Sequence, residues 1–241
     1  MPLIAVPNVS EGRDHQRIDH FTSVLSAAGV DVLDVHTDAV HHRTVFTITG
    51  SDDGLSGAAV GLAAACKESI DLRSHDGRHP RLGGLDVWPF VPHQAPLDDA
   101  VVAAHATGKR IADELNLPVY FYGAAARRAE FRELSDLRRG GLDTLIERAS
   151  TDLPPDEGPT QIDPRHGVVC LGARDVLIAF NVWLDGPVER AEEIAAGIRE
   201  RRGGLAGVRA LGIELDSHRS QVSMNLTDPE RGGIEDAFTA I

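Results

Sequence analysis

The sequence predicts an α+β protein built from two ferredoxin-like (split βαβ) subdomains in tandem, the second of them incomplete. Two observations lead to this fold class. The order strand, helix, strand, strand, helix occurs once from Met1 and again from Val176, although the two halves show no obvious sequence identity. Between them, residues 151–167 hold four prolines and two glycines, as in a structured loop or linker. We therefore expect an N-terminal subdomain over residues 1–172 and a partial C-terminal subdomain over residues 173–241.

Apolar periodicity defines the elements of the first half. Apolar residues three and four apart predict helices, and short β-branched or apolar runs predict strands. Ser10 is a candidate cap for the first helix. The charged stretch 124–149 is expected to be helical in two pieces, broken at Gly140 and Gly141. The other helices are expected over residues 14–28, 51–71 and 97–115, and the strands over residues 3–6, 30–35, 45–49, 85–91 and 119–122.

The second half repeats the alternation in fewer residues. Strands are expected over residues 176–184, 208–215 and 221–226, with a helix over residues 188–201 and another beginning at Glu235. A split βαβ unit that lacks its last strand leaves a sheet edge and an apolar face without a neighbour. We therefore expect either a shortened form of the fold or a partner subunit that covers the edge.

Composition narrows the class of protein. With 42% apolar and 25% charged residues over 241 positions, the chain has the make-up of a soluble globular protein. It has no apolar run of the roughly 20 residues that a membrane helix needs, and its first residues are too polar for a signal peptide, so we expect a cytoplasmic protein. A net charge of −13 argues against nucleic acid or an anionic membrane as a partner. Cys66 and Cys170 are far apart in sequence, which indicates neither a disulfide framework nor a zinc knuckle.

Residues 70–92 concentrate the side chains that can do chemistry. Pro80 fixes its own φ and pushes His79 out of the α region, and Gly77 tolerates positive φ, so His79 is displayed from extended backbone. A histidine held in this way can move protons near neutral pH beside an anionic ligand. The alternative is a polar connection whose histidines only cap a helix and meet solvent. The local positive patch that an anionic ligand would need consists of Arg73, Arg78 and Arg81.

The same segment resembles the most recognisable motif of the glutamate formiminotransferase family, S-R-H-x-G-x-H-P-R-x-G-x-x-D-V-x-P-F. The match runs from Arg73 to Phe90, with the first two residues in swapped order. In that family the histidine of the His-Pro pair is catalytic, a role that the resemblance carries over to His79. His75 also matches the motif but takes no role from it.

Shorter segments extend the resemblance over nearly the whole chain. Residues 6–13 are similar to the family's opening V-P-N-F-S-E-G-R, and residues 34–45 to its D-x-H-S-D-x-D-H-N-R-S-V connection, with departures at Val40 and His42. Residues 158–167 resemble the segment that contacts folate, where backbone amides of a turn can bind a pterin or a carboxylate. A plain linker is the alternative for that segment. The substrate- and folate-binding residues that the resemblance implies are Asn8, His36, Asp38, Arg43, Arg81, Gly158, Pro159, Thr160, Gln161, Ile162, Asp163, Pro164, Arg165, His166 and Gly167.

The resemblance implies a transferase of one-carbon metabolism and histidine degradation. It would move a formimino group from N-formimino-L-glutamate, or a formyl group from a related compound, to N5 of tetrahydrofolate, the co-substrate. His79 would be the general acid/base and the arginines would pair with glutamate carboxylates. The family also favours a homodimer. The alternative is a folate-binding or partner-binding protein that has lost transfer activity.

A metal-dependent hydrolase that uses His36, His41, His75 and His79 is a further alternative. His75 and His79 stand four residues apart, as the zinc ligands of a helical protease motif do. Gly77 and Pro80 oppose a helix there, and no Glu follows His75. We therefore expect a site without a metal ion.

Overall fold

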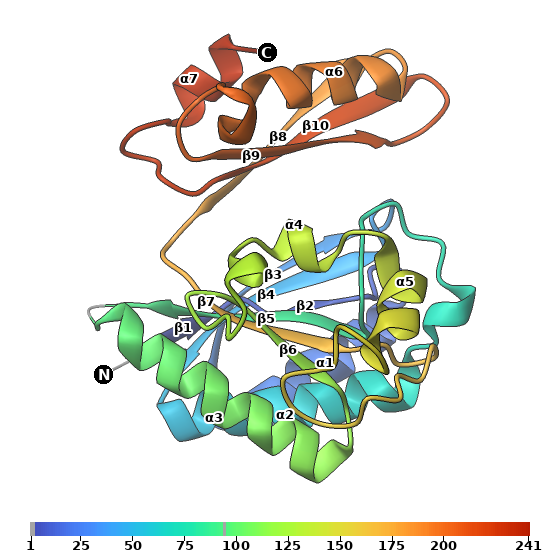
Figure 1. Ribbon diagram of the computed structural model, residues 1–241, viewed down its shortest axis with the longest axis vertical. Coiled ribbons are helices and arrows are strands. Elements are labelled where there is room, and N and C mark those ends of the chain that lie inside the picture. Colours follow the sequence, from blue (N-terminus) through green and yellow to red (C-terminus); the bar gives the residue numbers. More distant parts are fainter. Residues whose placement is uncertain (1–2, 94) are drawn as a thin grey trace. The chain divides into compact units, whose positions relative to one another are not determined.

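The computed structural model describes residues 3–93 and 95–241 and divides into two compact units, the first ending at Arg174 and the second beginning at Asp175 (Figure 1). Each unit packs helices on a β-sheet, which confirms the α+β class. The Pro-rich loop 151–167 lies within the first unit, because the strand that follows it joins the sheet of that unit. In the described part of the chain, no helix combines the length and the apolar character needed to span a membrane.

The first unit is built on a seven-stranded mixed sheet, in which the strands follow the order β1-β4-β2-β5-β7-β6 and β3 pairs with β4. The sequence did not indicate β2 or β7. The short β2 continues the line of β1 beyond Pro7, and β7 inserts in parallel between β5 and β6. The strands are β1 (Leu3–Ala5), β2 (Asn8–Val9), β3 (Asp31–Asp38), β4 (Arg43–Gly50), β5 (Leu85–Pro92), β6 (Val119–Gly123) and β7 (Val169–Ala173).

Helices cover the two faces of this sheet unequally (Figure 1). The long helices α1 (His15–Ala27), α2 (Asp52–Ser69) and α3 (Leu97–Leu115) bury the larger apolar core against one face. On the other face, the short helices α4 (Leu134–Leu137) and α5 (Gly141–Ala149) cover a smaller core. The second face therefore has room for polar residues.

Local signals explain most helix boundaries. Helix α1 begins after Asp14, whose carboxylate accepts a hydrogen bond from the backbone N–H of Arg17, so the expectation that Ser10 caps it is wrong. The Ser10 hydroxyl instead donates to the carbonyl of Gly83, 2.8 Å away. In the charged stretch 124–149 the first helical turn begins only at residue 129. The expected break occurs at Gly140, which has a φ of 85°.

A β-bulge at the start of β5 aims Asp86 toward the second face. Asn8 pairs with Val87 and Val9 pairs with Leu85, so Asp86 is the extra residue on its strand. Leu85 belongs to the larger core and Val87 to the smaller one. Asp86 shares the side of Val87, because its carboxylate bonds to an arginine that directly follows α4. The bulge thus buries an acidic side chain on the face that the short helices cover.

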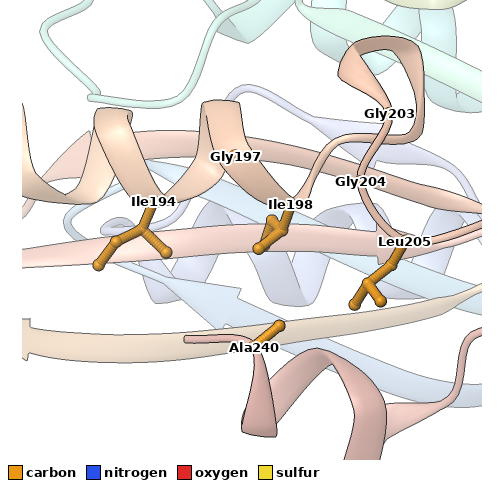
Figure 2. Close-up of a pocket in the computed structure, with 7 residues that line it drawn as sticks. All are labelled: Ile194, Gly197, Ile198, Gly203, Gly204, Leu205 and Ala240. Atoms are coloured by element: carbon orange, nitrogen blue, oxygen red, sulfur yellow. The ribbon is translucent and has the colours of Figure 1, made fainter.

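The second unit has a three-stranded antiparallel sheet in the order β8-β10-β9, packed against α6. A shallow pocket of about 530 Å³ opens beside the end of α6, and its side chains are apolar (Figure 2). None of its lining residues can carry charge, so it does not suit proton transfer. The elements of this unit are β8 (Ile178–Asp185), α6 (Val188–Ile198), a 3₁₀ turn (Glu200–Arg202), β9 (Val208–Glu214), β10 (Arg219–Leu226) and α7 (Ile234–Thr239). The first unit has 3₁₀ turns at Leu72–Ser74 and Ala129–Arg132.

Candidate functional site

The His79 imidazole is partly buried and held in one orientation. Its Nδ1 lies 2.8 Å from the carbonyl oxygen of Pro80. Because a carbonyl oxygen only accepts hydrogen bonds, the ring carries its proton on Nδ1 and leaves Nε2 as the basic nitrogen. The ring also meets His41 edge-on, with 5.8 Å between the ring centroids. His79 is thus a fixed imidazole with a defined basic atom.

Two arginines and one buried aspartate stand next to His79. The carboxylate of Asp86 is completely buried and accepts hydrogen bonds from Nη1 of Arg43, at 2.6 Å, and from Nη2 of Arg138. Its other oxygen accepts the backbone N–H of Leu82 at 2.7 Å. Burial alone would raise the pKa of Asp86, but Arg138 and Arg43 outweigh it and hold the pKa well below its usual range. Two cations thus face one anion, and the cluster carries excess positive charge.

This surrounding keeps His79 neutral. Burial lowers the pKa of His79 well below 6.5, and the charges of Arg43 and Arg138 lower it further. Asp86 opposes them but does not reverse the effect. At neutral pH the ring is therefore in the form that can accept a proton.

Arg81 braces the loop that carries His79. Its Nη2 donates to the carbonyls of Gly77 at 2.9 Å, of His41 at 3.2 Å and of His79 itself. Its Nη1 lies 2.6 Å from Nδ1 of His75. Burial lowers the pKa of Arg81 to about 10, so it remains a cation at neutral pH.

A second polar layer lies behind the loop. His42 stacks on His75 with 4.2 Å between ring centroids, and its Nδ1 accepts the backbone N–H of Gly12 at 3.0 Å. The buried carboxylate of Glu11 accepts the backbone N–H groups of Gly12, Arg13 and Asp14. Burial would raise the pKa of Glu11, but the hydrogen bonds from Arg13 and Asp14 and nearby positive charges lower it. His42 has a φ of 49°, a backbone region that His adopts more readily than most residues.

Of three other residues singled out in the sequence, two make side-chain hydrogen bonds within the protein and the third is exposed. Asn8 accepts a hydrogen bond from Nε of Arg43 at 2.9 Å and donates to the carbonyl of Val6, so it orients Arg43. Asp38 accepts the backbone N–H groups of residues 40 and 41, both at 2.8 Å, and shapes the turn that presents His41. His36 is exposed on β3, opposite Val45.

The segment 158–167 lies beside the His79 loop. The backbone N–H of Leu72 donates to the carbonyl of Arg165 at 3.0 Å, and that of Gly84 to the carbonyl of His166 at 3.1 Å. The backbone carbonyl of Asp163 closes a turn by accepting hydrogen bonds from the N–H groups of residues 166 and 167. Gly158 and Gly167 have positive φ, and Ile162 packs in the smaller core. The residues of the segment that are exposed at its surface are Gly158, Thr160, Gln161, Asp163, Pro164 and Arg165, whereas Pro159 and His166 are partly buried.

Sequence reasoning missed Arg138. It stands 52 positions from Asp86, just after α4, in a stretch without a motif. Its Nε is buried without a hydrogen-bond partner in the described structure, which is unusual for an arginine nitrogen. Within residues 3–93 and 95–241, no three His, Cys, Asp or Glu side chains converge as metal ligands would.

The fold and site together define an α+β protein with a neutral histidine beside an arginine pair, an arrangement suited to proton transfer on an anionic ligand. Residues 3–174 match the model of the formiminotransferase domain, N-terminal subdomain. The chain belongs to this family, which confirms the resemblance seen in the sequence.

Curated relatives share the match. The chain is 38% identical to the glutamate formimidoyltransferase of Streptococcus pyogenes serotype M1, over 98% of the chain and 81% of the relative. It is also 38% identical to the glutamate formimidoyltransferase of Thermoplasma acidophilum, over 98% of the chain and 80% of the relative. The formimidoyltransferase-cyclodeaminase of Sus scrofa is 39% identical over 97% of the chain but only 45% of its own length.

Proposed function

We propose that this protein is a glutamate formimidoyltransferase that moves a formimino group from N-formimino-L-glutamate to N5 of tetrahydrofolate. The observation that carries the proposal is the neutral His79 ring, fixed by Pro80 and flanked by Arg43 and Arg138. Two relatives that share four-fifths of their length with this chain are named glutamate formimidoyltransferase, which supports the proposal.

The reaction needs one proton to leave and another to arrive. The N5 nitrogen of tetrahydrofolate attacks the amidine carbon of the donor and loses its proton to Nε2 of His79. The tetrahedral intermediate then breaks the bond between that carbon and the glutamate nitrogen, which takes the proton back from His79. The products are glutamate and 5-formiminotetrahydrofolate. A well-placed general acid/base of this kind contributes roughly 10²- to 10⁴-fold to the rate.

The excess positive charge around Asp86 supports the choice of substrate. Both substrates carry glutamate carboxylates, whereas the chain as a whole has a net charge of −13. An anionic ligand therefore needs a local positive field, and Arg43 and Arg138 supply one next to His79. The proposed folate contact is the segment 158–167, whose carbonyls of Arg165 and His166 accept the backbone N–H groups of Leu72 and Gly84 on the two sides of the His79 loop.

The finer structural expectations also remain proposals. The order β8, α6, β9, β10, α7 in the second unit supports a relation to a split βαβ unit. Subdomains over residues 1–172 and 173–241, a cytoplasmic location and a homodimer are proposed on the family resemblance.

A transfer assay tests the function directly. The purified chain is incubated with tetrahydrofolate and either N-formimino-L-glutamate or N-formyl-L-glutamate, and folate products are identified by chromatography and mass spectrometry. We expect 5-formiminotetrahydrofolate from the formimino donor, and none when either substrate is left out. Tetrahydrofolate binding without any product would refute the proposal and support a folate-binding protein without transfer activity.

A further inference from the structure

The hydrogen bonds of Arg81 point to a role that the sequence did not suggest. The sequence assigned it to a substrate carboxylate, but its Nη1 and Nη2 atoms already face four acceptors of the protein. Its Nε is buried and has no hydrogen-bond partner in the described structure. Three of the four acceptors are backbone carbonyls, those of His41, Gly77 and His79, and the fourth is Nδ1 of His75. One planar group therefore joins the turn before β4, at His41, to residues 75, 77 and 79 of the His79 loop.

The loop is closed tightly around this guanidinium. A Cβ atom on Gly77 would lie 2.6 Å from Nη2 of Arg81 and 2.4 Å from the carbonyl oxygen of His41. No residue larger than glycine fits there without moving the brace. The His79 carbonyl accepts a hydrogen bond from Arg81, and the His79 ring is hydrogen-bonded to the carbonyl of Pro80. Both the backbone and the side chain of His79 are therefore fixed.

His75 completes the brace in a defined protonation state. Its Nδ1 accepts hydrogen bonds from Arg81 and from the backbone N–H of Gly77, at 3.2 Å. The ring proton therefore lies on Nε2, which donates to the carbonyl of Ser10 at 3.1 Å. This bond ties the loop to the end of β2.

We infer that Arg81 is a positioning residue, which holds the backbone of residues 75–79 so that the His79 ring keeps its orientation for proton transfer, and that it does not bind a substrate carboxylate. The inference rests on the proposed function. Lysine cannot replace it, because a single ammonium lacks the planar fork that reaches several acceptors at once.

Steady-state kinetics separate the two roles of Arg81. In Arg81→Gln and Arg81→Lys we expect kcat to fall about 10²-fold, the effect of a small misplacement of a catalytic group, with the KM for N-formimino-L-glutamate nearly unchanged. Added methylguanidinium should restore part of the kcat of Arg81→Gln. A raised KM with unchanged kcat, or full activity of Arg81→Lys, would overturn the inference. Arg139→Gln, which changes an exposed arginine that pairs with Asp136, is the matched control and should leave both constants unchanged.

A second readout does not need activity. Nitrogen-15 NMR of the imidazole rings reports which ring nitrogen carries the proton. We expect His75 protonated on Nε2 and His79 on Nδ1 in the unmodified protein, with both preferences lost in Arg81→Gln and, if that variant does not fold, in Arg81→Lys. Ring signals that stay unchanged would overturn the inference. Absence of transfer by the unmodified protein would refute only the proposed function, because the NMR comparison stands without it.

Discussion

Two neighbouring loops of the first unit use different means to keep their shape. The His79 loop, residues 75–81, is held by the side chains of Arg81 and His75. These two side chains contact each other and bind backbone carbonyls. The segment 158–167 is held by backbone hydrogen bonds and by two glycines with positive φ. The first loop presents one reactive nitrogen, and the second presents a shaped stretch of backbone.

The difference teaches which changes each loop tolerates. Side chains of the segment 158–167 are largely exposed, so its shape depends on glycine conformation and close backbone approach. The His79 loop instead depends on charged and titratable groups in contact. We therefore expect substitutions in the first loop to act on chemistry and pH response, and substitutions where the loops meet to act on stability.

His79→Ala tests the chemical side of this comparison and has the largest expected effect. Loss of the general acid/base should lower kcat about 10²- to 10⁴-fold in the transfer assay while tetrahydrofolate still binds. Binding is measured separately by isothermal titration calorimetry. His15→Ala, which alters an exposed histidine at the start of α1, should retain normal turnover. Near-normal turnover of His79→Ala would end the assignment of His79.

Asp86→Asn tests the charged cluster behind the loop. The change removes the negative charge that Arg43 and Arg138 share, and it leaves one amide oxygen in place of the two oxygens that accept from these arginines and from the N–H of Leu82. The buried Arg43 and the partly buried Arg138 then lack their counter-charge. We expect the free energy of unfolding in urea to fall by about 3–5 kcal/mol. Asp152→Asn, which breaks an exposed ion pair with Arg148, should change it by less than about 1 kcal/mol. Equal effects of the two variants would show that the buried cluster adds no stability.

Gly83→Ala tests the close approach between the chain just after the His79 loop and the end of the segment 158–167. Gly83 pairs with Gly167, and a Cβ atom on Gly83 would lie 1.9 Å from the carbonyl oxygen of Val168. These two stretches of backbone must separate to admit the Cβ atom, and we expect a loss of about 3 kcal/mol or more in the free energy of unfolding. Gly57→Ala is the control, because a Cβ there meets nothing within 4 Å and the residue lies inside α2. The free energy of unfolding of Gly57→Ala should rise by up to about 1 kcal/mol. If Gly83→Ala were as stable as the parent, the close approach of Gly83 to the Val168 carbonyl would be contradicted.

Sequence reasoning located the loop but not its surroundings. Pro80 indicated a fixed His79, and helix α3 was predicted over residues 97–115 as the structure has it. Periodicity succeeded there because a long amphipathic helix repeats its signal many times. Gly77 does not have the positive φ that the sequence allowed for; a glycine is needed there because Arg81 and the carbonyl of His41 lie too close for a Cβ atom.

Short or distant features escaped prediction for physical reasons. Strand β2 has only two residues, and the bulge that turns Asp86 depends on its register against that strand. Arg138 reaches Asp86 across 52 positions, a contact that only the folded sheet creates. Arg81 looked like a ligand because a guanidinium beside a catalytic loop suits carboxylates, whereas in the structure it faces acceptors of its own chain.

His75→Asn, which changes the pH dependence of the free energy of unfolding, has the smallest expected effect. It tests the titratable groups that distinguish the His79 loop from the segment 158–167. Burial, followed by the charge of Arg81, lowers the pKa of His75 to about 4, whereas an unfolded histidine titrates near 6.5. Below pH 6.5 the unfolded state therefore binds the proton that folded His75 refuses, so the free energy of unfolding falls as the pH is lowered from 6.5 toward 4. In His75→Asn, whose side chain does not titrate, we expect a shallower decrease between pH 6.5 and 5 in urea unfolding.

The slope, not the absolute stability, is the measured quantity, because the substitution also removes hydrogen bonds at every pH. Burial also lowers the pKa values of His41, His42, His79 and His166, so His75→Asn should flatten the curve only in part. His15→Asn, at an exposed position on α1, serves as the control and should keep the parent slope. If His75→Asn also keeps the parent slope of unfolding free energy against pH, protonation of His75 is not linked to unfolding. The contacts of Arg81 with the His79 loop would then not depend on a neutral His75 ring.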